Sequence, residues 1–205
     1  MHPPDLRRQF GEIDIYLFDQ LLRGRLPGDA RVLDAGCGRG RNLVYLLQAG
    51  YDVFATDADG SAIDAVRRLA AELAPTLSAD HFRAEPVERM TFEDGFADVV
   101  ISSAVLHFAR DGYHFAAMLR EMWRVMRPGG LFFSRLASDV GIEERIVPLG
   151  GRQFLLPDGS QRYLVNEAML MRFTGELGGM LIDPLKSTLV QDQRSMTTWV
   201  ARKRG

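Results

Sequence analysis

The sequence contains a single cysteine and no long hydrophobic run, and both shortages exclude classes of protein. Cys37 has no partner for an internal disulfide and no second thiol for a thiolate metal site, which is typical of a reducing compartment. No apolar stretch reaches the roughly 18 residues of a membrane-spanning helix, and residues 1–10 lack the apolar segment of a secretion signal. We therefore expect a cytoplasmic protein with no membrane partner.

An excess of positive charge is also missing. The chain carries 25 Lys and Arg against 27 Asp and Glu, which gives a net charge of -2. Proteins that bind phosphate backbones usually carry a basic excess, so we expect no nucleic-acid partner. The 205 residues, of which 46% are hydrophobic and 25% charged, suit one globular domain, and we predict a single domain over residues 1–205.

Short β-branched runs alternate with longer helical patterns through most of the chain. In two of the intervening segments, apolar spacings of three and four follow an Asp suited to cap a helix and stop at Pro or Gly. Alternation of this kind predicts an α/β fold in which a parallel sheet carries helices on both faces. The strand-like runs are RVLDAG, YDVFATD, HFRAE, ADVVISS and GLFFSRLAS.

The two ends of the chain depart from this alternation. Residues 1–29 form a helical segment, which is amphipathic over 6–23. Residues 139–165 form a β-hairpin insertion after the fifth strand, because Asp158 and Gly159 are a turn pair between two strand-like arms. A short helix and two closely spaced strands follow, and their short connection favours a final antiparallel pair.

Gly36, Gly38 and Gly40 lie directly between a strand-like run and a helical pattern. Glycine lets a ligand approach the main chain, and such a loop presents free N–H groups and the positive end of a helix to an anion. The alternative is a tight turn without a ligand. The dinucleotide fingerprint G-x-G-x-x-G would need its third glycine at the position of Arg41, which disfavours a nicotinamide cofactor.

An acid ends the second strand-like run. Asp57 follows the glycine loop by about twenty residues, where a carboxylate can accept hydrogen bonds from both hydroxyls of a ribose. The alternative role for Asp57 is a helix N-cap, for which Asp59 is better placed. The loop and this acid together indicate a ligand that carries a ribose.

These motifs resemble those of the class I S-adenosylmethionine-dependent methyltransferases. The matching segments are VLDAGCGRG, VFATD, ADVVISSAVLHF and EMWRVMRPGGLFF, which fall within residues 30–137. The resemblance implies a Rossmann-like three-layer sandwich with a seven-stranded, mostly parallel sheet whose last strand is antiparallel. It also implies S-adenosylmethionine as the cofactor, S-adenosylhomocysteine as the product and methylation as the reaction.

The resemblance further implies roles for individual residues. Asp34 would organise the methionine amino group, the three loop glycines would let the cofactor lie on the main chain, and Asp57 would hold the ribose. Ala58 would line the adenine, and Ser102 would offer its backbone carbonyl to the cofactor's ammonium group. The implied cofactor-binding residues are Asp34, Gly36, Cys37, Gly38, Gly40, Asp57, Ala58, Glu85, Val87 and Ser102.

One position departs from the family pattern. Pro86 stands where family members often place an Asp near the adenine amino group. Either Glu85 substitutes for that Asp, or Val87 contributes only its backbone. Within the glycine loop, Cys37 is interpreted as a small residue that fits the turn rather than as a nucleophile, which would need a nearby base.

A narrower resemblance lies in GRGRNLVYLLQAGYDVFATD, which is similar to the tellurite-resistance branch of these enzymes. In that branch an Arg-Asn pair opens the helix, and Gly-Tyr-Asp precedes the second strand. The hairpin insertion and the ending MTTWVARK point the same way. This resemblance implies a small oxyanion, or a small thiol or chalcogen compound, as the acceptor.

Acceptor residues must come from the loops after strands four and five and from the insertion, because open α/β sheets bind ligands at the carboxyl ends of their strands. His107 is the candidate general base, with simple packing as its alternative, and Arg135 is the candidate for an anionic acceptor. His81 and His114 have no partner at metal-ligand spacing, so no metal site is expected. Residues that surround the hairpin and would form a lid, unless they are merely solvated, are Arg145, Arg152, Arg162 and Tyr163.

We predict a methyltransferase that acts on a small-molecule acceptor, anions included, as a monomer or a homodimer. The alternative is a non-catalytic sensor or regulatory module that binds S-adenosylmethionine and has no open acceptor pocket. A nicotinamide oxidoreductase is a third candidate, and it conflicts with Arg41.

Overall fold

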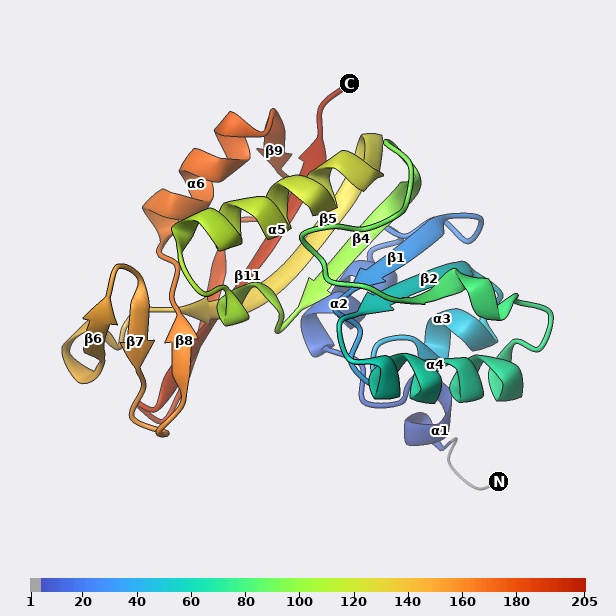
Figure 1. Ribbon diagram of the computed structural model, residues 1–205, viewed down its shortest axis with the longest axis horizontal. Helices are drawn as coiled ribbons and strands as arrows, with labels where there is room; N and C mark the ends of the chain where they lie inside the picture. Colours follow the sequence, from blue (N-terminus) through green and yellow to red (C-terminus); the bar gives the residue numbers. More distant parts are fainter. Residues whose placement is uncertain (1–4) are drawn as a thin grey trace.

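A computed structural model describes residues 5–205 (Figure 1). Its main sheet has the strand order β10-β11-β5-β4-β1-β2-β3, and an eighth strand, β9, pairs with β11. These strands are β1 (Arg31–Ala35), β2 (Asp52–Asp57), β3 (Phe82–Ala84), β4 (Ala97–Ser103), β5 (Met126–Ser138), β9 (Gly179–Leu181), β10 (Lys186–Val190) and β11 (Arg194–Lys203). The helices are α1 (Leu6–Phe10), α2 (Ile15–Leu22), α3 (Val44–Gln48), α4 (Gly60–Leu73), α5 (Gly112–Val125) and α6 (Glu167–Glu176), with 3-10 turns η1 (Ala79–His81), η2 (Leu106–Phe108) and η3 (Glu143–Arg145).

The sheet is parallel in its centre and antiparallel at its C-terminal edge. β1, β2, β3, β4 and β5 pair in parallel, whereas β11 runs antiparallel to β5 and to its other partners, β9 and β10. The predicted mostly parallel fold with an antiparallel last strand is confirmed. The first of the two closely spaced strands predicted near the C-terminus, MLIDPLKSTLV, is in fact two strands, β9 and β10, because Pro184 has no N–H for a sheet ladder and Asp183 binds Arg25 instead.

The N-terminal segment forms two helices rather than one. Gly11 ends α1 with φ +63, a left-handed conformation that interrupts the helical path. Each helix begins at an Asp whose side chain accepts a backbone N–H: Asp5 accepts from Arg8 and Asp14 from Tyr16. Residues 1–4 of the predicted helical segment lie outside the described residues.

The insertion after β5 is a small sheet of three strands at one end of the main sheet (Figure 1). The predicted hairpin is present as β7 (Gln153–Leu155) and β8 (Gln161–Tyr163), with Asp158 and Gly159 in the turn. The sequence did not predict β6 (Val147–Gly150), since all four of its residues are exposed and show no alternation of apolar and polar side chains.

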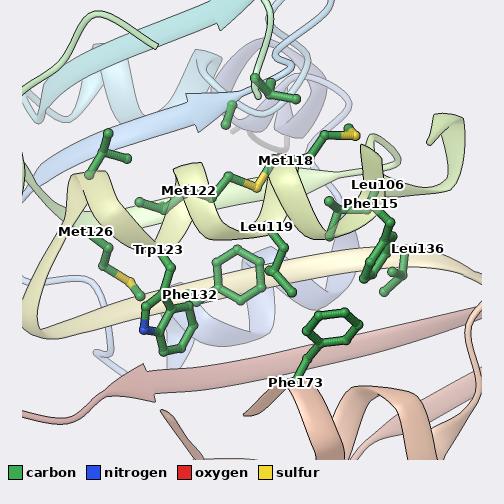
Figure 2. Packing of buried hydrophobic residues seen from close by; sticks show 14 of the residues in the cluster. Leu106, Phe115, Met118, Leu119, Met122, Trp123, Met126, Phe132, Leu136 and Phe173 are labelled. Carbon is green, nitrogen blue, oxygen red and sulfur yellow. The ribbon is translucent and has the colours of Figure 1, made fainter. Parts of the chain in front are cut away.

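Helices cover both faces of the main sheet. Helices α5 and α6 pack on one face, and α2, α3 and α4 pack on the other, so the molecule has three layers. Figure 2 shows the hydrophobic core between α5 and the sheet, where Met118, Met122 and Trp123 of α5 lie beside Phe132 of β5. None of the helices in residues 5–205 has the length and hydropathy to cross a membrane.

Candidate active site

A cavity lies at the carboxyl ends of β1, β2 and β4. Its volume is about 540 Å³, and we call it the first cavity. Its wall comes from the loops after these strands, from the loop after β3 and from the first turns of α5. This is the edge of an open α/β sheet where ligands are expected to bind.

The three glycines of the loop after β1 are suited to their positions for different structural reasons. Gly36 has φ +81, and a Cβ there would lie 2.6 Å from both methyl groups of Val105, so only glycine fits. Gly40 has φ +82 and packs against Val66. Gly38 also has a positive φ, but a Cβ there would meet no protein atom within 4 Å. The tight-turn alternative therefore accounts for Gly36 and Gly40, whereas Gly38 leaves main chain open beside the first cavity.

Asp34 is a buried carboxylate at the end of β1. It is 1% exposed, and its Oδ2 has no hydrogen-bond partner in residues 5–205. Burial raises the pKa of Asp34 to about 7, the nearby Arg41 opposes this rise, and the charge of Asp57 adds to it. An unsatisfied buried carboxylate is a strong acceptor for a cationic donor, because the charged form gains both a hydrogen bond and a counter-charge.

Asp57 connects the glycine loop to β2. Its Oδ2 accepts the N–H of Gly38 at 2.8 Å, and its Oδ1 accepts the N–H of Asp59 at 2.9 Å. The helix cap of α4 is Asp59, which accepts the N–H of Ser61. Each oxygen of a carboxylate has a second lone pair, so Asp57 keeps the capacity to accept two ligand hydroxyls at the cavity wall.

The loop after β3 differs from the sequence-based expectation. Glu85 does not line the first cavity, and its carboxylate accepts the N–H and the hydroxyl of Thr91 at 3.1 and 2.8 Å. Val87 does line the first cavity, as does Glu88, whose Oε1 lies 3.1 Å from Nε2 of His114. The geometry therefore favours a Val87 contact and replaces Glu85 with Glu88.

The loop after β4 is shifted by one residue from the expectation. Ser102 is fully buried within the sheet, and the cavity wall begins at Ser103 and continues through Ala104 and Val105. Cys37 also lines this cavity. Burial raises the pKa of the Cys37 thiol, which keeps it protonated and argues against a nucleophilic role.

A second cavity of about 390 Å³ adjoins the first and shares Arg41, Ala104 and Phe108 with it. Both residues predicted for the acceptor, His107 and Arg135, line this second cavity. The remaining wall comes from the β7–β8 turn region and from β10 and β11, and consists of Ala137, Leu156, Asp158, Ser160, Arg162, Val190, Arg194 and Met196.

His107 does not suit the predicted role of general base. Its Nδ1 accepts the N–H of Ala137 at 3.2 Å, so the proton of the neutral ring sits on Nε2. Burial, followed by the charge of Arg162, lowers the pKa of His107 to about 4. At neutral pH this side chain is a hydrogen-bond donor toward its surroundings and has no free lone pair for a substrate proton.

Arg135 meets a buried carboxylate from the N-terminal segment. Its Nη1 lies 3.4 Å from Oδ2 of Asp14, and its guanidinium lies over the ring of Tyr16 at 5.1 Å. Arg41 donates to the hydroxyl of Ser103 at 2.8 Å and lies 3.7 Å from the same Asp14 oxygen. The side chain of Asp14 is 1% exposed, so one buried carboxylate positions two arginines of the second cavity.

Only part of the predicted hairpin lining faces a candidate site. Arg162 lines the second cavity, whereas Arg152 forms an ion pair with Asp139 at 2.6 Å. Tyr163 is buried and stacks on Phe115. Arg145 is exposed and pairs with Asp192 at 3.2 Å.

A family model described as a methyltransferase domain matches residues 33–134. This part of the chain is a methyltransferase domain. The match contains the whole wall of the first cavity. It excludes Arg135, the β7–β8 turn and β11, so the second cavity lies partly outside it.

Known proteins support this assignment of the methyltransferase domain. The malonyl-[acyl-carrier protein] O-methyltransferase of Enterobacter lignolyticus (strain SCF1) is 35% identical over 121 residues, which cover 58% of this chain and 44% of that protein. The tRNA 5-carboxymethoxyuridine methyltransferase of Escherichia coli (strain K12) is 26% identical over 113 residues, which cover 55% of this chain and 42% of that protein. The chain thus spans less than half the length of both relatives.

A solved structure extends the similarity beyond the methyltransferase domain match. The 1,6-didemethyltoxoflavin-N1-methyltransferase of Burkholderia thailandensis, with bound 1,6-didemethyltoxoflavin and S-adenosylhomocysteine, aligns with a TM-score of 0.71 at 19% identity. The alignment covers 98% of this chain and 82% of that one. It shows that the two chains share a fold.

Sequence reasoning missed three residues around the methyltransferase site. Asp14 has the signal of a helix cap, and nothing in the sequence places it beside Arg41. Arg194 enters the second cavity from β11, far along the chain. Glu88 was not predicted, because Glu85 is closer in sequence to Pro86, the position at which family members often have an Asp.

Proposed function

We propose that this protein transfers a methyl group from S-adenosylmethionine to a small-molecule acceptor and releases S-adenosylhomocysteine. The observation that carries the proposal is the buried carboxylate of Asp34, whose Oδ2 has no hydrogen-bond partner within residues 5–205 and which lies near a second carboxylate, Asp57. The cofactor is suited to this site because it offers an ammonium group to one acid and ribose hydroxyls to the other. The names of the relatives support the reaction class.

The residues of the first cavity then have defined tasks. Asp34 holds the ammonium group in its charged form, and Asp57 accepts the ribose hydroxyls. Gly38 gives the cofactor direct access to main chain, while Ala58 and Val87 provide apolar wall for the adenine.

S-adenosylmethionine supplies an activated methyl group on a sulfonium, so the protein has to align the acceptor and exclude water. The Nδ1 of His107 already accepts the N–H of Ala137, so His107 does not remove a proton from the acceptor. An acceptor that is already ionised, or that is soft, reacts under these conditions without a base. The second cavity provides room for it, which favours an enzyme over a sensor without an acceptor pocket.

The resemblance to the tellurite-resistance branch supports a small oxyanion, thiol or chalcogen compound as one acceptor class. The relatives' names add malonyl-[acyl-carrier protein], 1,6-didemethyltoxoflavin and the 5-carboxymethoxyuridine of tRNA as substrates of those proteins. The net charge of -2 and the modest second cavity favour a small molecule over a nucleic acid for this chain. A single domain, a cytoplasmic location and a monomeric or homodimeric state complete the proposal.

Asp57→Ala tests the cofactor site. We expect this variant to bind S-adenosylhomocysteine about 1 to 3 kcal/mol more weakly, because the ligand's hydroxyls lose a charged acceptor. Calorimetric titration measures the change, and thermal unfolding without ligand verifies the fold. The matched control is Asp59→Ala, which removes the cap of α4 and leaves the cavity wall intact. Equal affinity of wild type and Asp57→Ala would refute the role.

A further inference from the structure

Four arginines from four separate segments line the second cavity. Arg41 follows the glycine loop, Arg135 belongs to β5, Arg162 to β8 and Arg194 to β11. Four like charges that lie close together in space repel one another, so the fold brings them together at an electrostatic cost. A cluster of this kind indicates a site for an anion.

The carboxylates around the cluster do not balance it. Asp14 lies close to Arg41 and Arg135, and Asp158 is the one acidic residue of the cavity wall itself. Four guanidinium groups minus these two carboxylates leave two positive charges. The hydroxyl of Ser160, and then the charges of Arg194 and Arg162, lower the pKa of Asp158, so this one carboxylate faces two arginines.

The cluster also contains an unsatisfied donor. Nε of Arg135 is buried and has no hydrogen-bond partner in the part of the chain that the structure describes. Buried donors are nearly always paired in folded proteins, so this atom points to an acceptor that a ligand would bring. Arginine's planar fork suits an oxygen pair in one plane, which is the geometry of a carboxylate.

Most of the remaining wall is apolar, and His107 and Ser160 are its other polar residues. Leu156, Val190 and Met196 line the second cavity together with Phe108, whose ring lies 4.9 Å from the guanidinium of Arg162. A ligand that fills this cavity therefore combines an apolar body with a charged end. A bare inorganic oxyanion would leave these apolar groups uncovered.

We propose that the second cavity binds the methyl acceptor as a small organic carboxylate, with Arg162 and Arg194 as the residues that select its charge. The inference rests on the proposed function and adds the class of acceptor to it. A carboxylate is ionised at neutral pH and carries its own lone pairs, so it needs no general base. The two cavities meet at Arg41, Ala104 and Phe108, which gives the acceptor access to the cofactor side.

Binding to protein saturated with S-adenosylhomocysteine tests this site. The probes are hexanoate, benzoate and phenylacetate, each compared with its uncharged primary amide by calorimetric titration. We expect at least one carboxylate to bind ten times more tightly than its amide. Arg162→Gln and Arg194→Gln should each weaken that carboxylate at least fivefold and leave the affinity for S-adenosylhomocysteine unchanged.

The matched control is Arg145→Gln, because Arg145 belongs to the same insertion, is exposed and does not line the cavity. The proposal is overturned if every amide binds as well as its carboxylate, or if Arg145→Gln weakens the carboxylate as much as the cavity variants do. If S-adenosylhomocysteine itself fails to bind, the proposed function falls. In that case, titration of the ligand-free protein with the same carboxylates and amides tests separately whether the second cavity binds a carboxylate.

Discussion

Replacing Asp34 with asparagine should stabilise the ligand-free protein at pH 8 and weaken its binding of S-adenosylmethionine. A pKa raised from 3.8 to about 7 means that the folded state holds a proton that the unfolded state releases. The stability of the wild type therefore falls as pH rises from about 4 to about 7, by about 4 kcal/mol at about 1.4 kcal/mol per pH unit. Above pH 7 the whole penalty is present.

The asparagine variant removes the buried charge that causes this penalty. Because its amide must also be desolvated, we expect a net gain of about 1 to 3 kcal/mol at pH 8, and little gain at pH 4. Urea unfolding at both pH values measures the difference. The same variant should bind S-adenosylmethionine about 1.5 to 3 kcal/mol more weakly, because the charged hydrogen-bond acceptor has been removed.

Asp64→Asn is the control for Asp34→Asn, since Asp64 is an exposed carboxylate on α4. Its stability at pH 8 should match that of the wild type within about 0.5 kcal/mol. An Asp34→Asn variant that is less stable than wild type at pH 8, or that binds the cofactor equally well, contradicts the account of this carboxylate.

The second large effect is expected for Gly36→Ala. The added Cβ meets a backbone with φ +81, which costs about 1 to 2 kcal/mol for a side chain, and lies 2.6 Å from the methyl groups of Val105. Overpacking adds about 1 to 3 kcal/mol. We expect a loss of about 2 to 5 kcal/mol in the free energy of unfolding, measured by urea denaturation, and loss of cofactor binding as Val105 moves into the first cavity.

Gly24→Ala separates the two contributions to the Gly36 effect. Gly24 has φ +65, and a Cβ there would meet no atom within 4 Å, so this variant carries the backbone strain without the collision. It should lose about 1 to 2 kcal/mol and bind the cofactor normally. If both glycine variants lose the same stability, packing against Val105 is not what requires glycine at position 36.

The sequence predicted the elements that have strong local signals. Alternating strand runs located β1 to β5, and Asp59 and Asn166 begin α4 and α6 as their capping chemistry indicates. The sequence did not reveal β6, which is four residues long, or the break that separates β9 from β10, because the pairing of such short strands is set by neighbouring strands rather than by local pattern.

The site divides in the same way. Asp34 and Asp57 were predictable because each ends a strand beside the glycine loop. The roles of Glu85 and His107 depend on contacts that no motif encodes. The hydroxyl of Thr91 donates a hydrogen bond to the carboxylate of Glu85, and the N–H of Ala137 fixes the tautomer of His107. The pairing of Asp14 with Arg41 and Arg135 requires the N-terminal segment to pack beside these arginines, which only the fold determines.

The measurement that tests the central claim most directly is a calorimetric titration of the wild-type protein with S-adenosylmethionine, S-adenosylhomocysteine and, separately, NAD. We expect the first two to bind at one site per chain and NAD to give no binding heat, since Arg41 occupies the position of the third fingerprint glycine. Absence of binding by both S-adenosyl compounds at millimolar concentration, or tighter binding of NAD, would contradict the methyltransferase account.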